Sequence, residues 1–423
     1  MLSNVTVPLV GATDVFVIGH QPDAALLAGL AFGASIFNMT FFAFNFLKMG
    51  VIGTTAQAAG AGDMPEAGAI LYRAVLLSIL IGGALILIRP LATSAAFALS
   101  ASSPEIEAAA DAYIRIRFFA GPATLMQFAL VGWLWGLQDM RGGFLIQVAT
   151  NVTNMALDLW FVLHLGWGIE GAAGASVIAE WSGALLGLAL VWRRLARSGR
   201  PAWADVLALP RLRRMFQLNR DLFIRTLALT GGLLLFRAEA NGFGAAEAAA
   251  VATLFQIFTI ITYAVDGFAN AVNPMVGDAV GRRNTTALRA AVRAAFQAGG
   301  LTALFASAVL LFALPDLVRL FTDIPDVVAA ADAQYAWTAL LPIVTVWCFV
   351  MDGMFLGAAL NTVVRNAMLQ ATAIYLLLLY TLPAFMGIHG LWLAVLAFGA
   401  LRALTLALKW SRLLRSAANA PER

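Results

Sequence analysis

The chain has 423 residues, of which 61% are hydrophobic and only 12% are charged, and its mean hydropathy is +0.84. Soluble domains contain roughly 45–50% apolar and about 25% charged residues, so this composition excludes a water-soluble globular protein and, more firmly, a disordered or fibrous one. The formal net charge is +4, and one cysteine with three histidines leaves almost no material for a disulfide, a His/Cys metal site or Cys–His catalysis.

Apolar runs of about 20 residues, the length of a membrane-spanning helix, follow one another along the chain. We therefore predict an all-α polytopic membrane protein with about twelve transmembrane helices. The first run is short and contains Pro8 and Asp14, and we expect that the given start truncates this helix by a turn or two. The expected spans are residues 2–19, 26–48, 70–90, 113–136, 143–165, 170–192, 221–241, 246–270, 293–314, 334–357, 366–386 and 390–410.

Arginines gather in alternate loops, and this asymmetry predicts the orientation of the chain. Eight arginines lie between residues 193 and 220 against one acid, four lie in 282–293, and a basic tail begins at Arg402. Even-numbered loops and both termini are therefore expected on the cytoplasmic side of a bacterial inner membrane. The intervening loops are acidic and contain Glu105, Glu107 and Asp111 in one case and Asp316, Asp323, Asp326 and Asp332 in another.

The sequence repeats itself at an offset of 221 residues. The segment 103–112, Ser-Pro-Glu followed by an alanine run and Asp-Ala, recurs as Ile-Pro-Asp with a similar run at 324–333. At the same offset Gly60 corresponds to Gly281, and Gly136 corresponds to Gly357.

This offset contains six helices, so the two halves are expected to run in the same sense through the membrane. Parallel repeats of this kind are typical of transporters, whose substrate site lies at the repeat interface. We predict two pseudosymmetric six-helix bundles, at residues 1–195 and 219–412, with a basic cytoplasmic linker at 196–218 and a cytoplasmic tail at 413–423.

Ionisable side chains inside a membrane span are costly, and each one is a candidate functional group. Asp14 lies in the first expected span, and the fifth span places Asn151, Asn154 and Asp158 on one helical stripe. Ser176, early in the sixth span, can add a hydroxyl. These hard oxygen groups suit a proton or sodium, and Asp14 and Asp158, if they face each other, share coupled titrations. The alternative is interhelical hydrogen bonding, which we favour for Asn151 and not for Asp158.

The second half contains fewer polar groups within its spans. Arg237 and Glu239 lie in the seventh span, where pairing with neighbouring helices and a functional role are equally supported. Asp266 in the eighth span and Asp352 in the tenth are each followed by glycine, which indicates a helix bend or close helix contact as readily as a binding site.

Several strings resemble the multidrug and toxic compound extrusion (MATE) family, in its DinF-like branch, and the resemblance covers essentially the whole chain. The first is PLVGATDVFVIGH at residues 8–20. The others are FLKMG at 46–50, TAQAAGA at 55–61, NRD with IRT at 219–226, DGFA at 266–269, MDGMFLG at 351–357 and VRNAM at 364–368.

The resemblance implies a MATE-type fold, with two six-helix lobes and a central cavity open to one side at a time. It also implies an ion site at Asp14, Asn154 and Asp158, with Ser176 where the family often has threonine. Glu239, Asp266 and Asp352 are possible second-lobe site residues. One departure is the run Asn270–Pro274, where the branch usually has an acid, so a carboxylate role there does not carry over.

We therefore expect a secondary antiporter that exports organic cations or amphipathic toxicants in exchange for protons or sodium. It is expected to act as a monomer in membrane lipid, without a cofactor, a metal or a nucleic-acid partner. The alternative is a flippase or exporter of a lipid-linked precursor or metabolite, which would need basic residues facing the cavity, whereas the arginines here lie in cytoplasmic loops. An intramembrane enzyme needs a convergent His, Cys or Ser-base constellation, which three scattered histidines do not supply.

Overall fold

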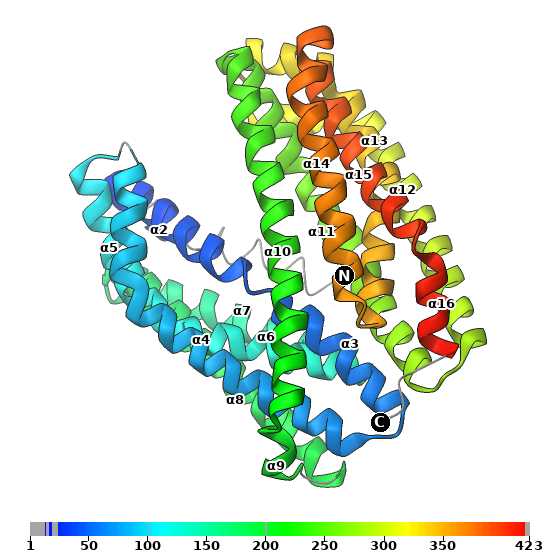
Figure 1. The fold of residues 1–423 in the computed structure, drawn as a ribbon. Coiled ribbons are helices and arrows are strands. Elements are labelled where there is room, and N and C mark those ends of the chain that lie inside the picture. The colour runs from blue at the N-terminus through cyan, green and yellow to red at the C-terminus, as the bar shows by residue number, and fades with distance from the viewer. Residues whose placement is uncertain (1–12, 14–16, 19–23, 101, 199–200, 419–423) are drawn as a thin grey trace. The chain divides into compact units, whose positions relative to one another are not determined.

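The computed structural model describes residues 13, 17–18, 24–100, 102–198 and 201–418, and these are almost entirely helical (Figure 1). Most of the first expected span, 2–19, lies outside the described residues. The helices group into two compact units. We call residues 1–55 and 63–215 the amino-terminal unit, and residues 56–62 and 216–423 the carboxy-terminal unit.

The amino-terminal unit is built from pairs of packed helices: α2 lies against α5, α4 against α6, and α7 against α8. Pro104 is the first residue of α5, and Asp139 caps α7 by accepting a hydrogen bond from the amide of Gly142 at 3.0 Å. The elements are α2 Ala24–Phe42, α3 Phe46–Gly60, α4 Met64–Leu99, α5 Pro104–Arg117, η1 Phe118–Ala120, α6 Gly121–Gly136, α7 Met140–Asp158, η2 Leu159–His164, α8 Gly168–Ser198 and α9 Trp203–Val206.

The carboxy-terminal unit packs α13 against α11, α12 and α15, and packs α14 against α15. Its core contains the fully buried aromatic side chains of Phe236, Tyr375 and Trp392. The elements are α10 Leu209–Ala240, η3 Asn241–Phe243, α11 Ala245–Gly281, α12 Thr285–Phe321, α13 Pro325–Gly357, α14 Asn361–Met386, α15 Ile388–Ala407 and α16 Trp410–Ala418.

The two units repeat the same helical frame at the offset of 221 residues. Helices begin at 24, 64, 104 and 140 in one unit and at 245, 285, 325 and 361 in the other. The caps repeat as well: Asp63 accepts a hydrogen bond from the amide of Glu66 at 3.1 Å, and Asn284 accepts one from the amide of Ala287 at 2.9 Å. The predicted internal repeat is confirmed.

Matching glycines bring equivalent helices together in both units. Gly132 and Gly136 lie on α6, and Gly353 and Gly357 lie on α13, so each unit has two glycines one turn apart. A Cβ atom on any of the four would lie less than 3.0 Å from a carbonyl oxygen of the facing helix, so only glycine permits this approach. The facing oxygens belong to Lys48 and Ile52 on α3 and to Ala269 and Asn273 on α11.

The expected spans agree with the helices, with two informative exceptions. Within the described part of the chain, nine helical stretches are long and apolar enough to cross a membrane. This count does not reach twelve, because α7 and α10 fall on expected spans but are too polar to meet the criterion, and the first span is not described. The two exceptional helices contain most of the polar residues discussed below.

Candidate functional site

Two of the predicted site residues meet in the amino-terminal unit. Asn154 on α7 and Ser176 on α8 are 3% and 4% exposed, and the Asn154 Nδ2 donates a hydrogen bond to the Ser176 Oγ at 3.1 Å. This bond fixes the orientation of the amide. Among the described residues the Asn154 Oδ1 is buried and accepts no hydrogen bond, which is an uncommon state for a buried oxygen.

Asp158 lies one turn beyond Asn154 on the same face of α7 and is completely buried. It is the last residue of α7, and the chain continues directly into the π-helical turn η2. Single π-turns of this kind occur frequently at functional sites. Asp14, the expected partner of Asp158, lies outside the described residues, so their proximity remains a prediction.

The buried stripe on α7 differs from the predicted one by a single residue. Thr150, Asn154 and Asp158 are all buried, whereas Asn151 is only partly buried. The spacing of four residues keeps the three on one face, because α7 packs against α8 along this line.

A second group of polar residues, which sequence reasoning missed, continues from this stripe. Glu180 lies one turn after Ser176, and its carboxylate accepts a hydrogen bond from the Gln127 Nε2 at 2.7 Å and pairs with Arg117 at 3.4 Å. The Gln127 Oε1 in turn accepts a hydrogen bond from the Thr150 hydroxyl at 3.2 Å. The available signal was the position of Glu180 in the middle of the sixth expected span.

The carboxy-terminal unit holds its deepest acid between two bases. Asp352 on α13 pairs with Arg225 on α10 at 2.5 Å and with Arg402 on α15 at 2.7 Å, and all three side chains are less than a tenth exposed. The assignment of Arg402 to the basic tail is therefore wrong: it lies inside α15, where a buried carboxylate stabilises its charge. Asp352 links three helices of this unit.

A similar arrangement surrounds Asp221 near the start of the same bundle. This buried carboxylate pairs with Arg365 at 2.6 Å and with Arg220 at 3.2 Å, and it accepts a hydrogen bond from Thr362. Both buried acids of the carboxy-terminal unit are thus held by two guanidinium groups each. Sequence reasoning gave no role to these residues, since their partners lie on distant helices.

The other predicted residues of the second half are dispersed. Glu239 is half-buried, and Arg237 is exposed, with its guanidinium 5.4 Å from the centre of the Phe255 ring on α11. Asp266 lies within α11, and its side chain is outside the described set. Among the described residues no group of three His, Cys, Asp or Glu side chains could hold a metal ion.

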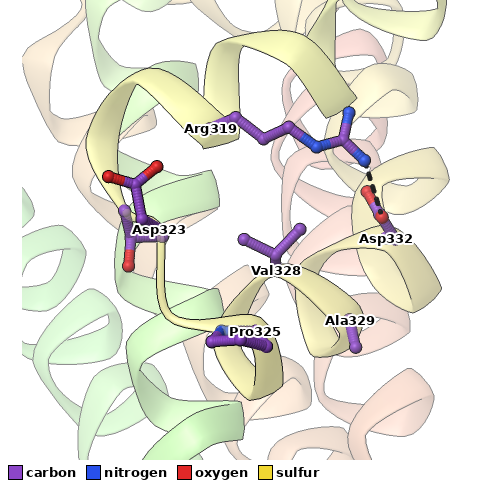
Figure 2. Close-up of a pocket in the computed structure, with 7 residues that line it drawn as sticks. Arg319, Asp323, Pro325, Val328, Ala329 and Asp332 are labelled. Carbon is purple, nitrogen blue, oxygen red and sulfur yellow. Dashed lines mark hydrogen bonds and ion pairs between the residues drawn. The ribbon is translucent and has the colours of Figure 1, made fainter.

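Figure 2 shows a surface cavity of about 370 Å³ at the turn between α12 and α13. Arg319 on one wall pairs with Asp332 at 3.4 Å, and the two side chains are 52% and 41% exposed. Exposed ion pairs contribute little stability. None of the predicted site residues lines this cavity, so it is separate from the candidate ion site.

Comparison with known proteins agrees with this architecture. The MatE family model matches residues 1–160 and 222–381. The chain belongs to the MatE family. It is 37% identical to the DNA damage-inducible protein F of Escherichia coli (strain K12) over 421 residues, covering 97% of this chain and 90% of that protein.

Two further comparisons place this MatE protein among its relatives. It is 27% identical to a probable multidrug resistance protein NorM of Xanthomonas campestris, covering 80% of this chain and 75% of that protein. A crystal structure described as MATE in the bent conformation has a TM-score of 0.89 at 19% identity, covering 99% of this chain and 94% of that one. Family membership supports a transporter role in a membrane, and the predicted MATE-type fold is confirmed.

Proposed function

We propose that this MatE protein is a secondary antiporter that exports organic cations or amphipathic toxicants in exchange for protons or sodium. Family membership supports a transporter, and the multidrug resistance proteins among its relatives support this substrate class. Members of the family are transporters, so an enzymatic activity is not proposed.

The observation that carries the proposal is the state of Asn154. Its amide is oriented by Ser176, its oxygen accepts no hydrogen bond, and the buried Asp158 lies one turn away. A buried acceptor without a partner costs roughly 1–3 kcal/mol. A proton held by a neighbouring carboxyl group, or a sodium ion, gives this oxygen a partner, and amide, hydroxyl and carboxylate oxygens are suitable ligands for sodium.

In the transport cycle we assign the coupling ion to Asp14, Asn154, Asp158 and Ser176. Asp14 is included because of the family resemblance alone. An ion drives the cycle only through a difference in its affinity for the outward-facing and inward-facing states. We assign that difference to movement of the first helix relative to α7 and α8, and we propose alternating access at the bacterial inner membrane, with both termini cytoplasmic.

The second candidate is a flippase or exporter of a lipid-linked precursor or metabolite. Its sequence-level objection, that the arginines lie in cytoplasmic loops, does not hold for Arg225 and Arg402, which are buried among helices. Both, however, are paired with Asp352, so their charges are already compensated. We therefore retain the antiporter as the primary proposal.

The test is cation-dye transport by the full chain in proteoliposomes, with proton and sodium gradients imposed separately. We expect transport driven by one gradient, lost in Asp14→Asn and Asn154→Ala, and preserved in the control Asn151→Ala on the same helix. Normal coupled transport in Asp14→Asn would contradict the ion site. Absence of dye transport under either gradient, from folded protein, would favour a lipid-linked or metabolite substrate.

A further inference from the structure

Glu180 is an intramembrane acid to which the proposed antiport cycle gives no role. It lies on α8 one turn from Ser176, and its side chain is 19% exposed. The two oxygens of its carboxylate have different partners: Arg117 on α5 at 3.4 Å and the neutral amide of Gln127 on α6 at 2.7 Å. It therefore connects three helices of the amino-terminal unit beside the candidate ion site.

Glu180 is less firmly ionised than the buried acids of the other unit. One guanidinium group pairs with it, whereas two pair with Asp352 at shorter distances. Arg117 also has a second favourable contact, since its guanidinium carbon lies 3.9 Å from the centre of the Phe37 ring. Neutralising Glu180 therefore leaves Arg117 with a partner.

The other charged groups on elements packed against α8 lie farther along the helix. Thr124 on α6 also interacts with Glu180 but is uncharged. Asp158 lies two turns of α7 beyond Thr150. The remaining ones are His164 and Arg89 toward the start of α8, the pair Arg115–Glu170 at its first turn, Arg141 at the start of α7 and the pair Arg194–Asp139 near the end of α8.

Gln127 can satisfy every polar group in both protonation states of Glu180. With the carboxylate ionised, the Gln127 Nε2 donates to Glu180 and the Thr150 hydroxyl donates to the Gln127 Oε1. When one proton binds a carboxylate oxygen, the new O–H becomes a donor, and rotation of the amide presents the Gln127 Oε1 to it. The Gln127 Nε2 then donates to the Thr150 Oγ1, while the Thr150 hydroxyl donates to the Ile146 carbonyl, which already lies 2.9 Å away.

The packing leaves the bridge no alternative path. Gly183 on α8 faces both groups, and a Cβ atom there would overlap the Thr150 Oγ1 and crowd the Gln127 amide. Thr150 is one turn from Asn154, whose amide is bonded to Ser176. A change at Glu180 is thus transmitted to the face of α7 that holds the candidate ion site.

We propose that Glu180 is a second proton-binding carboxylate of the amino-terminal unit, and that rotation of the Gln127 amide transmits its protonation state to Thr150 and the Asn154–Asp158 site. The protonation of Glu180 itself stands independently of the antiport proposal, whereas its effect on ion and substrate affinity rests on that proposed function. Glu180 acts here as a positioning residue.

Infrared difference spectra of the purified full chain, titrated between pH 5 and pH 9, test the protonation directly. We expect a protonated-carboxyl band that titrates in wild type, is lost in Glu180→Gln, and persists in the control Glu170→Gln at the start of the same helix. Gln127→Leu keeps Glu180 but removes its partner, so its band should shift in frequency. This variant also serves as the readout if Glu180→Gln fails to fold. Absence of the band, or its persistence in Glu180→Gln, would overturn the assignment.

The pH dependence of cation-dye affinity, measured on the same preparations, tests the coupling. We expect Glu180→Gln to change the dye Kd at pH 8 at least about 5-fold, in the range of measured coupling between sites, and Gln127→Leu to abolish the further effect of Glu180→Gln in the double variant. Additive effects would overturn the transmission through Gln127. A lost band in Glu180→Gln with no dye binding by wild type would support the proton site and contradict the proposed substrate class.

Discussion

The amino-terminal and carboxy-terminal units have the same helical frame and different buried chemistry. Their helices begin 221 residues apart, and paired glycines make the same backbone contacts in each. Yet the polar interior of the first unit consists of Asn154, Ser176, Gln127 and Thr150 around weakly compensated acids, whereas each buried acid of the second is held by two arginines.

Positions related by the offset make the division clear. Asn154 corresponds to Tyr375, and Asp158 corresponds to Leu379, both of which belong to the hydrophobic core of the second unit. In the other direction, Asp352 corresponds to the buried Val131. The frame depends on caps and glycine contacts, so the buried polar groups can differ between the units without changing it.

The largest expected effect comes from breaking the compensated acid of the second unit. Asp352→Asn leaves two buried guanidinium groups without a counter-charge, and removing one partner of a buried pair costs roughly 3–5 kcal/mol. We expect a strong loss of thermal stability and of folded yield, measured by unfolding in detergent, with partial recovery in the double variant Asp352→Asn, Arg225→Met. A stable Asp352→Asn that has lost only transport would instead place Asp352 with the functional acids.

An intermediate effect tests whether the frames are equivalent. Gly132→Ala and Gly353→Ala occupy matching positions, and each adds a Cβ atom against a carbonyl oxygen of the facing helix. Such overpacking costs typically about 1–3 kcal/mol. We expect similar losses of unfolding temperature for the two, with Gly83→Ala, which meets no atom within 4 Å, as the control. Losses that differ widely would show that one unit tolerates helix separation better than the other.

The smallest effect on stability is expected at the candidate ion site. Asn154→Ala removes one buried hydrogen bond, worth about 0.5–1.5 kcal/mol, but also removes an acceptor that had no partner, so the two changes offset each other. We expect an unfolding temperature close to that of wild type together with loss of ion-coupled transport. A large destabilisation with transport retained would assign Asn154 a purely structural role.

Sequence alone was sufficient for the fold because spans and repeats are local or periodic properties. A run of about 20 apolar residues predicts a membrane helix without knowledge of its neighbours, and the offset of 221 residues predicted the matching of α5 with α13. The pairing of Asn154 with Ser176 also agreed with the expectation from polarity and family resemblance.

The missed residues have partners that no local pattern reveals. Glu180 has its hydrogen-bonding and charged partners on α5 and α6, and Arg402 is compensated by an acid 50 residues earlier. Counting charges near the end of a span treats such an arginine as part of a loop. Asn151 was included in the stripe because spacings of three and four residues are equivalent on an isolated helix, and only the packing of α8 selects Thr150.

The Arg225–Asp352–Arg402 cluster has a consequence for synthesis of the protein. Arg225 precedes Asp352 by 127 residues, so at about 5–20 residues per second α10 is made roughly 6–25 s before its counter-charge. During that interval α10 contains an uncompensated arginine and is not among the described stretches apolar enough to span a membrane by themselves. Stable insertion of α10 must therefore wait for α13, which makes the order of assembly in this half dependent on ion pairing rather than on the order in which its helices leave the ribosome.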